Sequence, residues 1–217
     1  MSSTRPSSEE RARRWDRTYA AHQPHELSWH SEDAWISIEL IQTLGINGDA
    51  AVIDVGGGAS VLARQLVAQG FIDMTVLDLS TEALAAARQH ADDAPVEWLH
   101  QDLLSWRPRR RYDVWHDRAV LHFLVEAEDR ERYRETLRAA LAPDGAVVIG
   151  AFAPDGPDRC SGLPVVRYSP AELVALLGAD FRLVDARRDE HLTPSGAVQP
   201  FSWIAVRALS AEGNRQP

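Results

Sequence analysis

The chain has 217 residues, of which 45% are hydrophobic and 25% are charged, and its formal net charge is −9. These values suit one folded domain with a sizeable core, and the negative charge disfavours nonspecific binding to nucleic acid or anionic membranes. Cys160 is the single cysteine, which excludes an internal disulfide framework and fits a reducing compartment. No apolar run approaches the length of a membrane span, and the N-terminus lacks a signal-peptide core. We therefore expect a cytoplasmic protein.

Two helices are expected before the first strand. The polar residues 1–8 and the residues 210–217 are expected to be disordered tails. Residues 9–21 and 32–44 carry apolar side chains at helical spacing. Because these two helices have no strand partners, we expect residues 9–45 to pack at the rim of a sheet or to cover its ligand edge.

A strand that runs into a glycine loop and then a helix is the most informative stretch. Residues 50–55 form a β-branched apolar run, residues 56–58 are all glycine, and helical spacing begins at Ser60. A helix start offers unpaired N–H groups to a ligand. The next apolar run, residues 72–77, is followed by Asp78, and a carboxylate at that place can accept hydrogen bonds from a ribose. Together these features indicate a nucleoside-type ligand.

Two nucleoside ligands compete for this loop. A dinucleotide site requires a third glycine beneath the pyrophosphate, and Gly56-x-Gly58 is followed by Ala59, Ser60 and Val61 instead. An acid, Asp54, stands two residues before the first glycine, where it suits a ligand with a cationic amino-acid end.

The motif Asp54-x-Gly56-x-Gly58-x-Ser60 resembles the first motif of class I S-adenosylmethionine (SAM)-dependent methyltransferases, with Ser60 at the last glycine position. This resemblance implies SAM as the cofactor and a Rossmann-like α/β fold. That fold is a seven-stranded, mostly parallel sheet with its last strand antiparallel and helices on both faces. The resemblance also implies that residues 9–45 form a helical lid and that residues 46–209 form the SAM-binding core.

The rest of the chain fits this topology. Strands and helices alternate up to the fifth strand, which indicates a parallel sheet, and two strands joined by a short turn then make an antiparallel hairpin. The expected strands are 95–99, 112–116, 146–152, 181–189 and 201–209, and the expected helices are 80–91, 126–141 and 169–177. Residues 153–167 are expected to form a long functional loop.

The resemblance assigns cofactor contacts residue by residue. An acid after the third strand commonly bonds the adenine amino group in such enzymes, and Asp102 with Leu103 matches that position. The cofactor residues expected in this way are Asp54, Gly56, Gly57, Gly58, Asp78, Leu79, Asp102, Leu103 and Asp117.

The topology also places residues at the acceptor side of the sheet edge. His122 and His191 are candidate catalytic bases for an O, N or S acceptor, and Arg167 is a candidate for attracting an anion. The candidate substrate residues are Trp29, Cys160, Arg167, Gln199 and Phe201. His122, Cys160 and His191 are also possible metal ligands by type, but they lack a local ligand spacing, so no metal is expected.

The sequence thus predicts a SAM-dependent methyltransferase with a small-molecule acceptor, since segments 160–168 and 191–201 look like those of small bacterial methyltransferases of that kind. A protein (lysine) methyltransferase is the alternative within this chemistry. A non-catalytic SAM- or nucleoside-binding protein and an NAD-dependent oxidoreductase are alternatives of other classes. We expect no nucleic-acid or membrane partner, and a monomer or homodimer.

Overall fold

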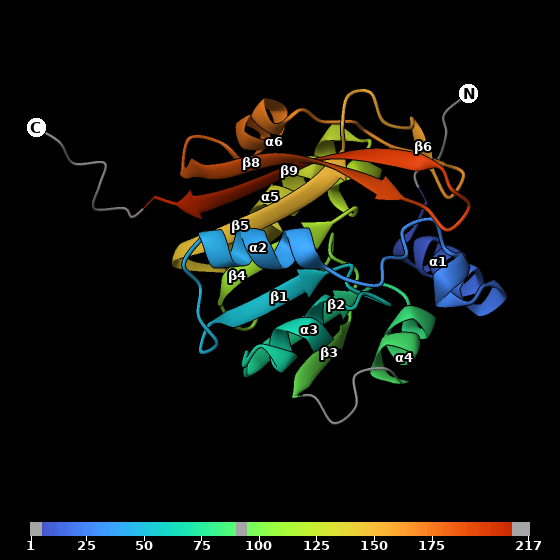
Figure 1. Cartoon of the computed structure of the whole chain (residues 1–217), viewed down its shortest axis with the longest axis horizontal. Coiled ribbons are helices and arrows are strands. Elements are labelled where there is room, and N and C mark those ends of the chain that lie inside the picture. Colours follow the sequence, from blue (N-terminus) through green and yellow to red (C-terminus); the bar gives the residue numbers. More distant parts are fainter. Residues whose placement is uncertain (1–5, 90–94, 210–217) are drawn as a thin grey trace, which may run out of the picture.

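Seven strands form one sheet in the computed structural model, which describes residues 6–89 and 95–209. The strand order is β3-β2-β1-β4-β5-β9-β8 (Figure 1). The strands are β1 (Ala51–Val55), β2 (Asp73–Asp78), β3 (Val96–His100), β4 (Tyr112–Arg118), β5 (Leu141–Phe152), β8 (Phe181–Leu192) and β9 (Val198–Ala208).

The first five strands pair in parallel, and β9 is antiparallel to both of its neighbours, β5 and β8. β8 therefore runs in the same direction as the first five strands. This arrangement confirms the seven-stranded topology expected from the sequence, with its last strand antiparallel.

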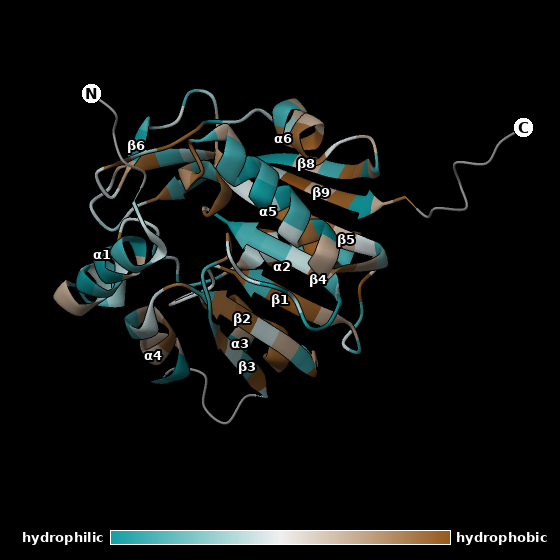
Figure 2. Cartoon of the chain, turned by 180° about the vertical axis from the view of Figure 1, so that it is seen from behind, coloured by the Kyte–Doolittle hydropathy of each residue, from teal (hydrophilic) through white to brown (hydrophobic). Residues whose placement is uncertain are grey.

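Helices cover both faces of the sheet. They are α1 (Ser8–Ala21), α2 (Trp35–Thr43), α3 (Leu62–Ala68), α4 (Thr81–Gln89), α5 (Ala127–Ala140) and α6 (Pro170–Leu177). Apolar side chains of α2, α3 and α4 pack on one face, and those of α5 and α6 pack on the other. Figure 1 shows α2 in front of the sheet, and Figure 2, drawn from behind, shows α5 in front of it.

The two helices expected to form a lid differ in their packing. α2 buries Ile36, Ile38, Leu40 and Ile41 against the sheet, so it belongs to the core layer. α1 has no buried residue and lies beside α4 at the ligand edge (Figure 1). The side chain of Asp16 on α1 accepts a 2.7 Å hydrogen bond from the Ser80 hydroxyl, just before α4 begins. Only α1 and the segment after it therefore lie where a lid would lie.

Both expected tails fall largely outside the described residues. Residues 210–217 and 1–5 are not described, and α1 begins at Ser8 within the tail expected from the sequence. The Ser7 side chain caps this helix in a capping box with Glu10, which explains why it starts earlier than the apolar pattern suggested.

The loop expected over residues 153–167 contains a short hairpin of β6 (Arg159–Cys160) and β7 (Leu163–Pro164). Two short 3-10 turns, η1 (Pro24–Glu26) and η2 (Leu121–Phe123), complete the described elements.

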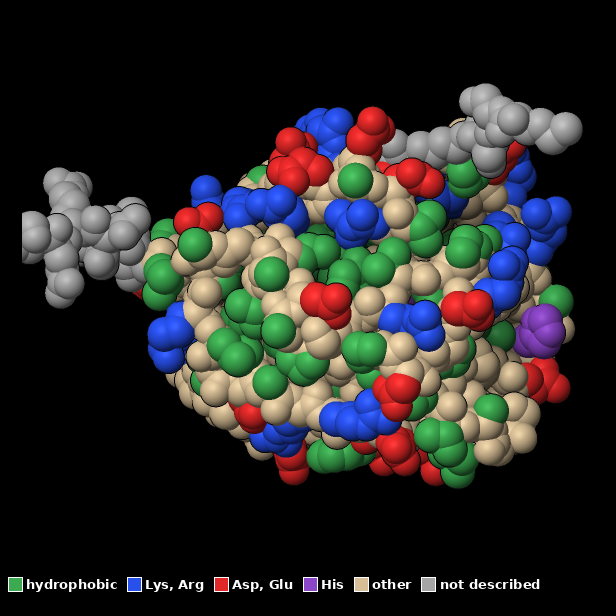
Figure 3. Space-filling model, turned by 90° about the horizontal axis from the view of Figure 1, so that it is seen from above, with side chains coloured by type: hydrophobic (Ala, Val, Ile, Leu, Met, Phe, Trp, Pro, Cys, Tyr) green, Lys and Arg blue, Asp and Glu red, His purple; other side chains and the backbone are tan. Residues whose placement is uncertain are grey.

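Strand β8 forms one edge of the sheet and carries charged side chains that discourage pairing with another chain. Arg187 forms an ion pair with Glu39, and Arg188 forms one with Asp155. Figure 3, seen from the side of α6 and β8, shows charges of both signs interspersed with apolar side chains. Across residues 6–89 and 95–209, no helix is both long and apolar enough to cross a membrane.

Candidate active site

The candidate site lies at the carboxyl edge of the parallel strands. The strand order reverses between β1 and β4, and open α/β sheets bind ligands at such a switch point. A cavity of about 1240 Å³ opens there, and residues from the ends of β1, β2, β3 and β4 line it. Side chains of α1 and of the segment between α1 and α2 line its other side.

The glycine loop borders this cavity through Gly56 and Gly57 and packs tightly against neighbouring side chains. Gly56 has φ +65°, and a Cβ atom there would lie 2.0 Å from the Val120 side chain. A Cβ on Gly57 would lie 2.4 Å from Asp54 Oδ2, and one on Gly58 would lie 2.7 Å from Asp78 Oδ2. The glycines therefore keep the backbone close to both carboxylates, which no other residue type could do without a shift.

Asp54 is held by a chain of buried hydrogen bonds. Its Oδ1 lies 2.7 Å from His116 Nδ1, and His116 Nε2 lies 2.9 Å from the Ser37 hydroxyl oxygen. The parallel register of β1 and β4 places Asp54 opposite His116. Asp54 Oδ2 is buried and has no hydrogen-bond partner among the described residues, so one carboxylate oxygen is available beside the glycine loop.

Asp78 ends β2 at the same edge. Its Oδ1 accepts a 2.8 Å hydrogen bond from the Ser80 backbone N–H, and the residue lines the cavity together with Leu79. Burial raises the pKa of Asp78 to about 6, although hydrogen bonds from backbone N–H groups oppose this shift. Tyr19 of α1 lies close by, and burial followed by the charge of Asp78 raises the pKa of its phenol.

Asp102 and Leu103 follow β3 and line the cavity as expected. Both carboxylate oxygens of Asp102 already have partners. Oδ2 accepts a 2.5 Å hydrogen bond from Arg11 Nη2 on α1, and Oδ1 accepts one of 3.0 Å from the Leu104 backbone N–H. Asp102 therefore ties α1 to the end of β3.

Asp117 is not among the cavity-lining residues. Its carboxylate accepts hydrogen bonds from the Val120 N–H (2.9 Å), the Leu121 N–H (3.1 Å) and the Tyr133 hydroxyl (2.8 Å). Successive side chains of a strand point to opposite faces, so Asp117 points toward α5 while His116 and Arg118 point toward the cavity. Asp117 thus fixes the turn after β4, and burial raises its pKa to about 6.

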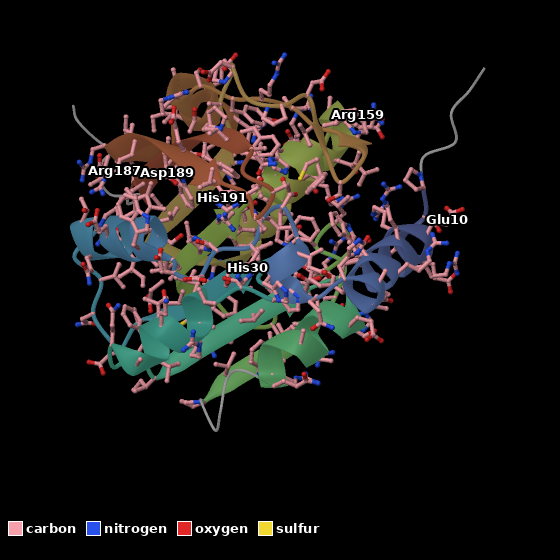
Figure 4. All side chains as sticks on the ribbon, turned by 45° about the vertical axis from the view of Figure 1, so that its right-hand side comes forward. Glu10, His30, Arg159, Arg187, Asp189 and His191 are labelled. Atoms are coloured by element: carbon pink, nitrogen blue, oxygen red, sulfur yellow. The ribbon has the colours of Figure 1, made fainter. Side chains whose placement is uncertain are left out.

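The acceptor end of the cavity brings together Trp29, Arg118, Cys160 and His191. His191 Nε2 donates to the Ser28 carbonyl oxygen at 2.8 Å, and its Nδ1 lies 3.4 Å from Arg118 Nη2. Burial, and then the charge of Arg118, lower the pKa of His191, so its ring is neutral at neutral pH. Burial raises the pKa of the Cys160 thiol. Figure 4 shows His191 of β8 and His30 near the centre of the view.

Four residues expected at the acceptor side do not line the cavity: His122, Arg167, Gln199 and Phe201. His122 is fully buried against Phe123 and Phe152, and neither of its ring nitrogens has a partner among the described residues. Burial lowers its pKa to about 3. Arg167 is exposed and donates to the Gly156 carbonyl oxygen at 3.2 Å.

The remaining two residues lie on β9, the strand that pairs with β8. Gln199 is half-buried opposite His191. Phe201 is buried one layer beneath the cavity, where the Arg118 guanidinium lies over its ring at 5.5 Å from the centroid. Within the described residues, no three His, Cys, Asp or Glu side chains form a group that could hold a metal ion.

Two residues of this site belong to no motif and were not predicted from the sequence: Ser37 and His116. His116 could have been found from the register, because a residue beside Asp54 on the neighbouring strand must face the same side of the sheet. No local signal marks Ser37, because α2, a helix far from His116 in the sequence, brings it to the site.

Comparisons with known proteins agree with this geometry. Residues 52–145 match the family model described as a methyltransferase domain. An uncharacterized methyltransferase of Mycobacterium bovis is 29% identical over 106 residues, which cover 48% of this chain and 52% of that protein. The trans-aconitate 2-methyltransferase of Mycobacterium tuberculosis is 33% identical over 93 residues, which cover 42% of this chain and 34% of that protein. The matches thus span about half, or less, of these relatives.

Solved structures share the fold over almost the whole chain. The 1,6-didemethyltoxoflavin-N1-methyltransferase of Burkholderia thailandensis, with bound S-adenosylhomocysteine, has a TM-score of 0.68 at 22% identity and covers 97% of this chain and 94% of its own. The N-methyltransferase NodS of Bradyrhizobium japonicum, also with bound S-adenosylhomocysteine, has a TM-score of 0.67 at 15% identity. The match covers 89% of this chain and 97% of the NodS chain.

Residues 52–145 are therefore similar to a methyltransferase domain, and the sheet topology with its glycine loop has the fold of class I SAM-dependent methyltransferases. The cofactor of this class is SAM, and the residues present fit it. The free oxygen of Asp54 suits a cationic ammonium group, Gly56 and Gly57 present bare backbone to the cavity, and Asp78 suits a ribose. Leu79 and Leu103 supply apolar surface in the same cavity.

Proposed function

We propose that this protein transfers a methyl group from SAM to a small-molecule acceptor. When bound, SAM supplies an electrophilic methyl group on a sulfonium centre. The chain would hold the ammonium end through Asp54, which the His116 and Ser37 hydrogen bonds orient. Asp78 would hold the ribose, and Leu79 and Leu103 would pack on the adenine.

The observation that carries the small-molecule acceptor is the cover over the acceptor end. Trp29 lies edge-on to Trp15 of α1 at 5.7 Å between ring centroids, and Trp15 meets Phe123 at 5.2 Å. The Arg118 guanidinium donates to the Trp29 carbonyl oxygen at 2.8 Å. These contacts join α1 and the segment after it to the end of β4, so a bulky protein substrate would have to displace them. Trans-aconitate and 1,6-didemethyltoxoflavin, the compounds in the names of two similar proteins, are both small.

His191 is the candidate base for an acceptor that must lose a proton, since its Nδ1 is unprotonated while Nε2 donates to the Ser28 carbonyl oxygen. We assign no proton transfer to His122, because it is buried away from the cavity.

The test is an acceptor screen that measures S-adenosylhomocysteine formation from SAM. Small carboxylic acids, amines, phenols and thiols form one panel, and lysine-containing peptides form the other. We expect turnover in the first panel only. Turnover of the peptides in preference would support the protein methyltransferase instead, and SAM binding without turnover in either panel would support the non-catalytic binding protein.

A further inference from the structure

Arg118 is a cation at the acceptor end of the cavity whose contacts are neutral groups. Its Nη1 donates to the Trp29 carbonyl oxygen at 2.8 Å, its Nη2 lies 3.4 Å from His191 Nδ1, and its guanidinium lies over the Phe201 ring. None of the ion pairs between described residues involves Arg118. A guanidinium has five N–H donors and stays charged in proteins, so donors remain available to a ligand in the cavity.

Arg118 is half-buried, and holding such a charge partly away from water without a paired counterion costs stability. Burial lowers the pKa of Arg118 from its usual value, although the charges of Asp189 and Asp54 oppose this shift. Asp189 lines the same cavity from β8, where Figure 4 shows it beside His191, but it does not form an ion pair with Arg118. An anionic ligand would complete the site by supplying the missing counterion.

The position of Arg118 relates this anion site to the cofactor site. Arg118 follows His116 by two residues on the same face of β4, a distance of about 7 Å along a strand, and His116 holds Asp54. Trp29, Phe123 and Leu163 line the cavity as well. A ligand held by Arg118 would therefore lie beside the amino-acid end of SAM, with apolar and aromatic side chains around the rest of it.

We propose that the methyl acceptor is a small organic acid whose carboxylate is bound by Arg118. This proposal rests on the proposed function and names its substrate class. It also moves the anion-binding role from Arg167, the residue expected from the sequence, to Arg118. Arg167 is exposed and lies outside the cavity, whereas the planar fork of Arg118 suits a carboxylate at two points.

The test uses titration calorimetry to measure how tightly small acids bind to protein that is already saturated with S-adenosylhomocysteine. The probes are benzoate, phenylacetate and trans-aconitate, each beside its neutral amide. We expect at least one acid to bind 10-fold or more tightly than its amide. Arg118→Gln should weaken that acid about 10- to 100-fold, the size expected when a charge-assisted pair is lost, and Arg118→Lys should weaken it less. Asp189→Asn, which removes a competing negative charge, should tighten it.

Arg167→Gln is the matched comparison, because it removes an equal charge outside the cavity, and it should bind the acid as the wild type does. Melting temperature and S-adenosylhomocysteine affinity report whether each variant is folded. The proposal would be overturned if acids and amides bound equally or if no acid bound. It would also be overturned if Arg118→Gln and Arg118→Lys bound the acid as tightly as the wild type does. Failure of the wild type to bind S-adenosylhomocysteine would instead overturn the proposed function.

Discussion

Asp78 illustrates at the scale of one residue how a binding site can reduce the stability of a fold. Its pKa is raised to about 6, with burial as the largest cause. The folded protein therefore takes up a proton near pH 6, whereas the unfolded chain takes it up only near pH 3.8. The stability that this group contributes is therefore present at low pH and is lost as the pH rises through about 6. At neutral pH the buried charge costs up to about 3 kcal/mol.

Asp78→Asn should separate the two roles of this residue. Without cofactor, the variant should melt at the same temperature as the wild type or higher at pH 7. Its advantage should shrink as the pH falls through 6 and vanish below about 4. Its affinity for S-adenosylhomocysteine should fall at least 10-fold, because the ribose loses a charged acceptor. Calorimetric melting from pH 4 to 8 measures the change in stability, and titration calorimetry measures the affinity. Asp49→Asn, at an exposed position, is the control. A lower melting temperature with unchanged affinity would refute the ribose assignment.

More of the residues expected at the cofactor side than of those expected at the acceptor side line the cavity. Asp54, Asp78 and Asp102 each stand at the end of a strand within a recognisable motif, and the cavity includes all three. His122 and Arg167 were placed only by the loop they occupy, and a loop does not determine which way a side chain points. The alternation of side chains along β4 explains why Arg118 enters the cavity and Asp117 does not.

At the scale of elements, α1 is held to the domain by few contacts. None of its residues is buried over its whole surface, although the Tyr19 phenol is enclosed beside Asp78 and Gly58. Its other ties are the Arg11–Asp102 ion pair, the Asp16–Ser80 and Arg14–Ser161 hydrogen bonds, and the ring contacts of Trp15. Elements with few buried apolar contacts open locally at low free energy. We therefore expect α1 to open without unfolding of the sheet, which would admit ligands to the cavity.

Arg11→Met should loosen α1, because it removes the partly buried ion pair with Asp102. A pair of this kind contributes roughly 1 kcal/mol, so amide hydrogen exchange over residues 8–21 should speed up about five-fold. Exchange in β1 and β4 should stay unchanged. Arg13→Met is the matched control, since Arg13 pairs only with Glu9 of the same helix among the described residues. Equal exchange in both variants would show that Asp102 does not hold α1.

The sequence distinguished α1 from α2 poorly because both show apolar residues at helical spacing. The periodicity of a helix predicts which face is apolar, but it does not predict which surface that face will meet. The hairpin of β6 and β7 was missed for a related reason: each strand has two residues, too few for any period to be visible.

At the scale of the whole molecule, the parallel sheet brings acids from three strand ends to one edge. β1 and β2 are neighbours, as are β2 and β3, and their carboxyl ends present Asp54, Asp78 and Asp102 in that order. β4 adds Arg118 on the other side of β1. The fold was predictable because strong strand and helix patterns alternate along most of the chain. The negative end of the cavity suits the cationic cofactor, and its positive end suits an anionic acceptor.

The binding of SAM and S-adenosylhomocysteine, measured by titration calorimetry beside NAD, tests the central claim most directly. We expect both sulfur compounds to bind one site per chain with dissociation constants on the order of micromolar, and NAD to give no binding heat. Binding of NAD, or no binding of either sulfur compound, would contradict the assignment of the glycine loop and of the three acids at the sheet edge.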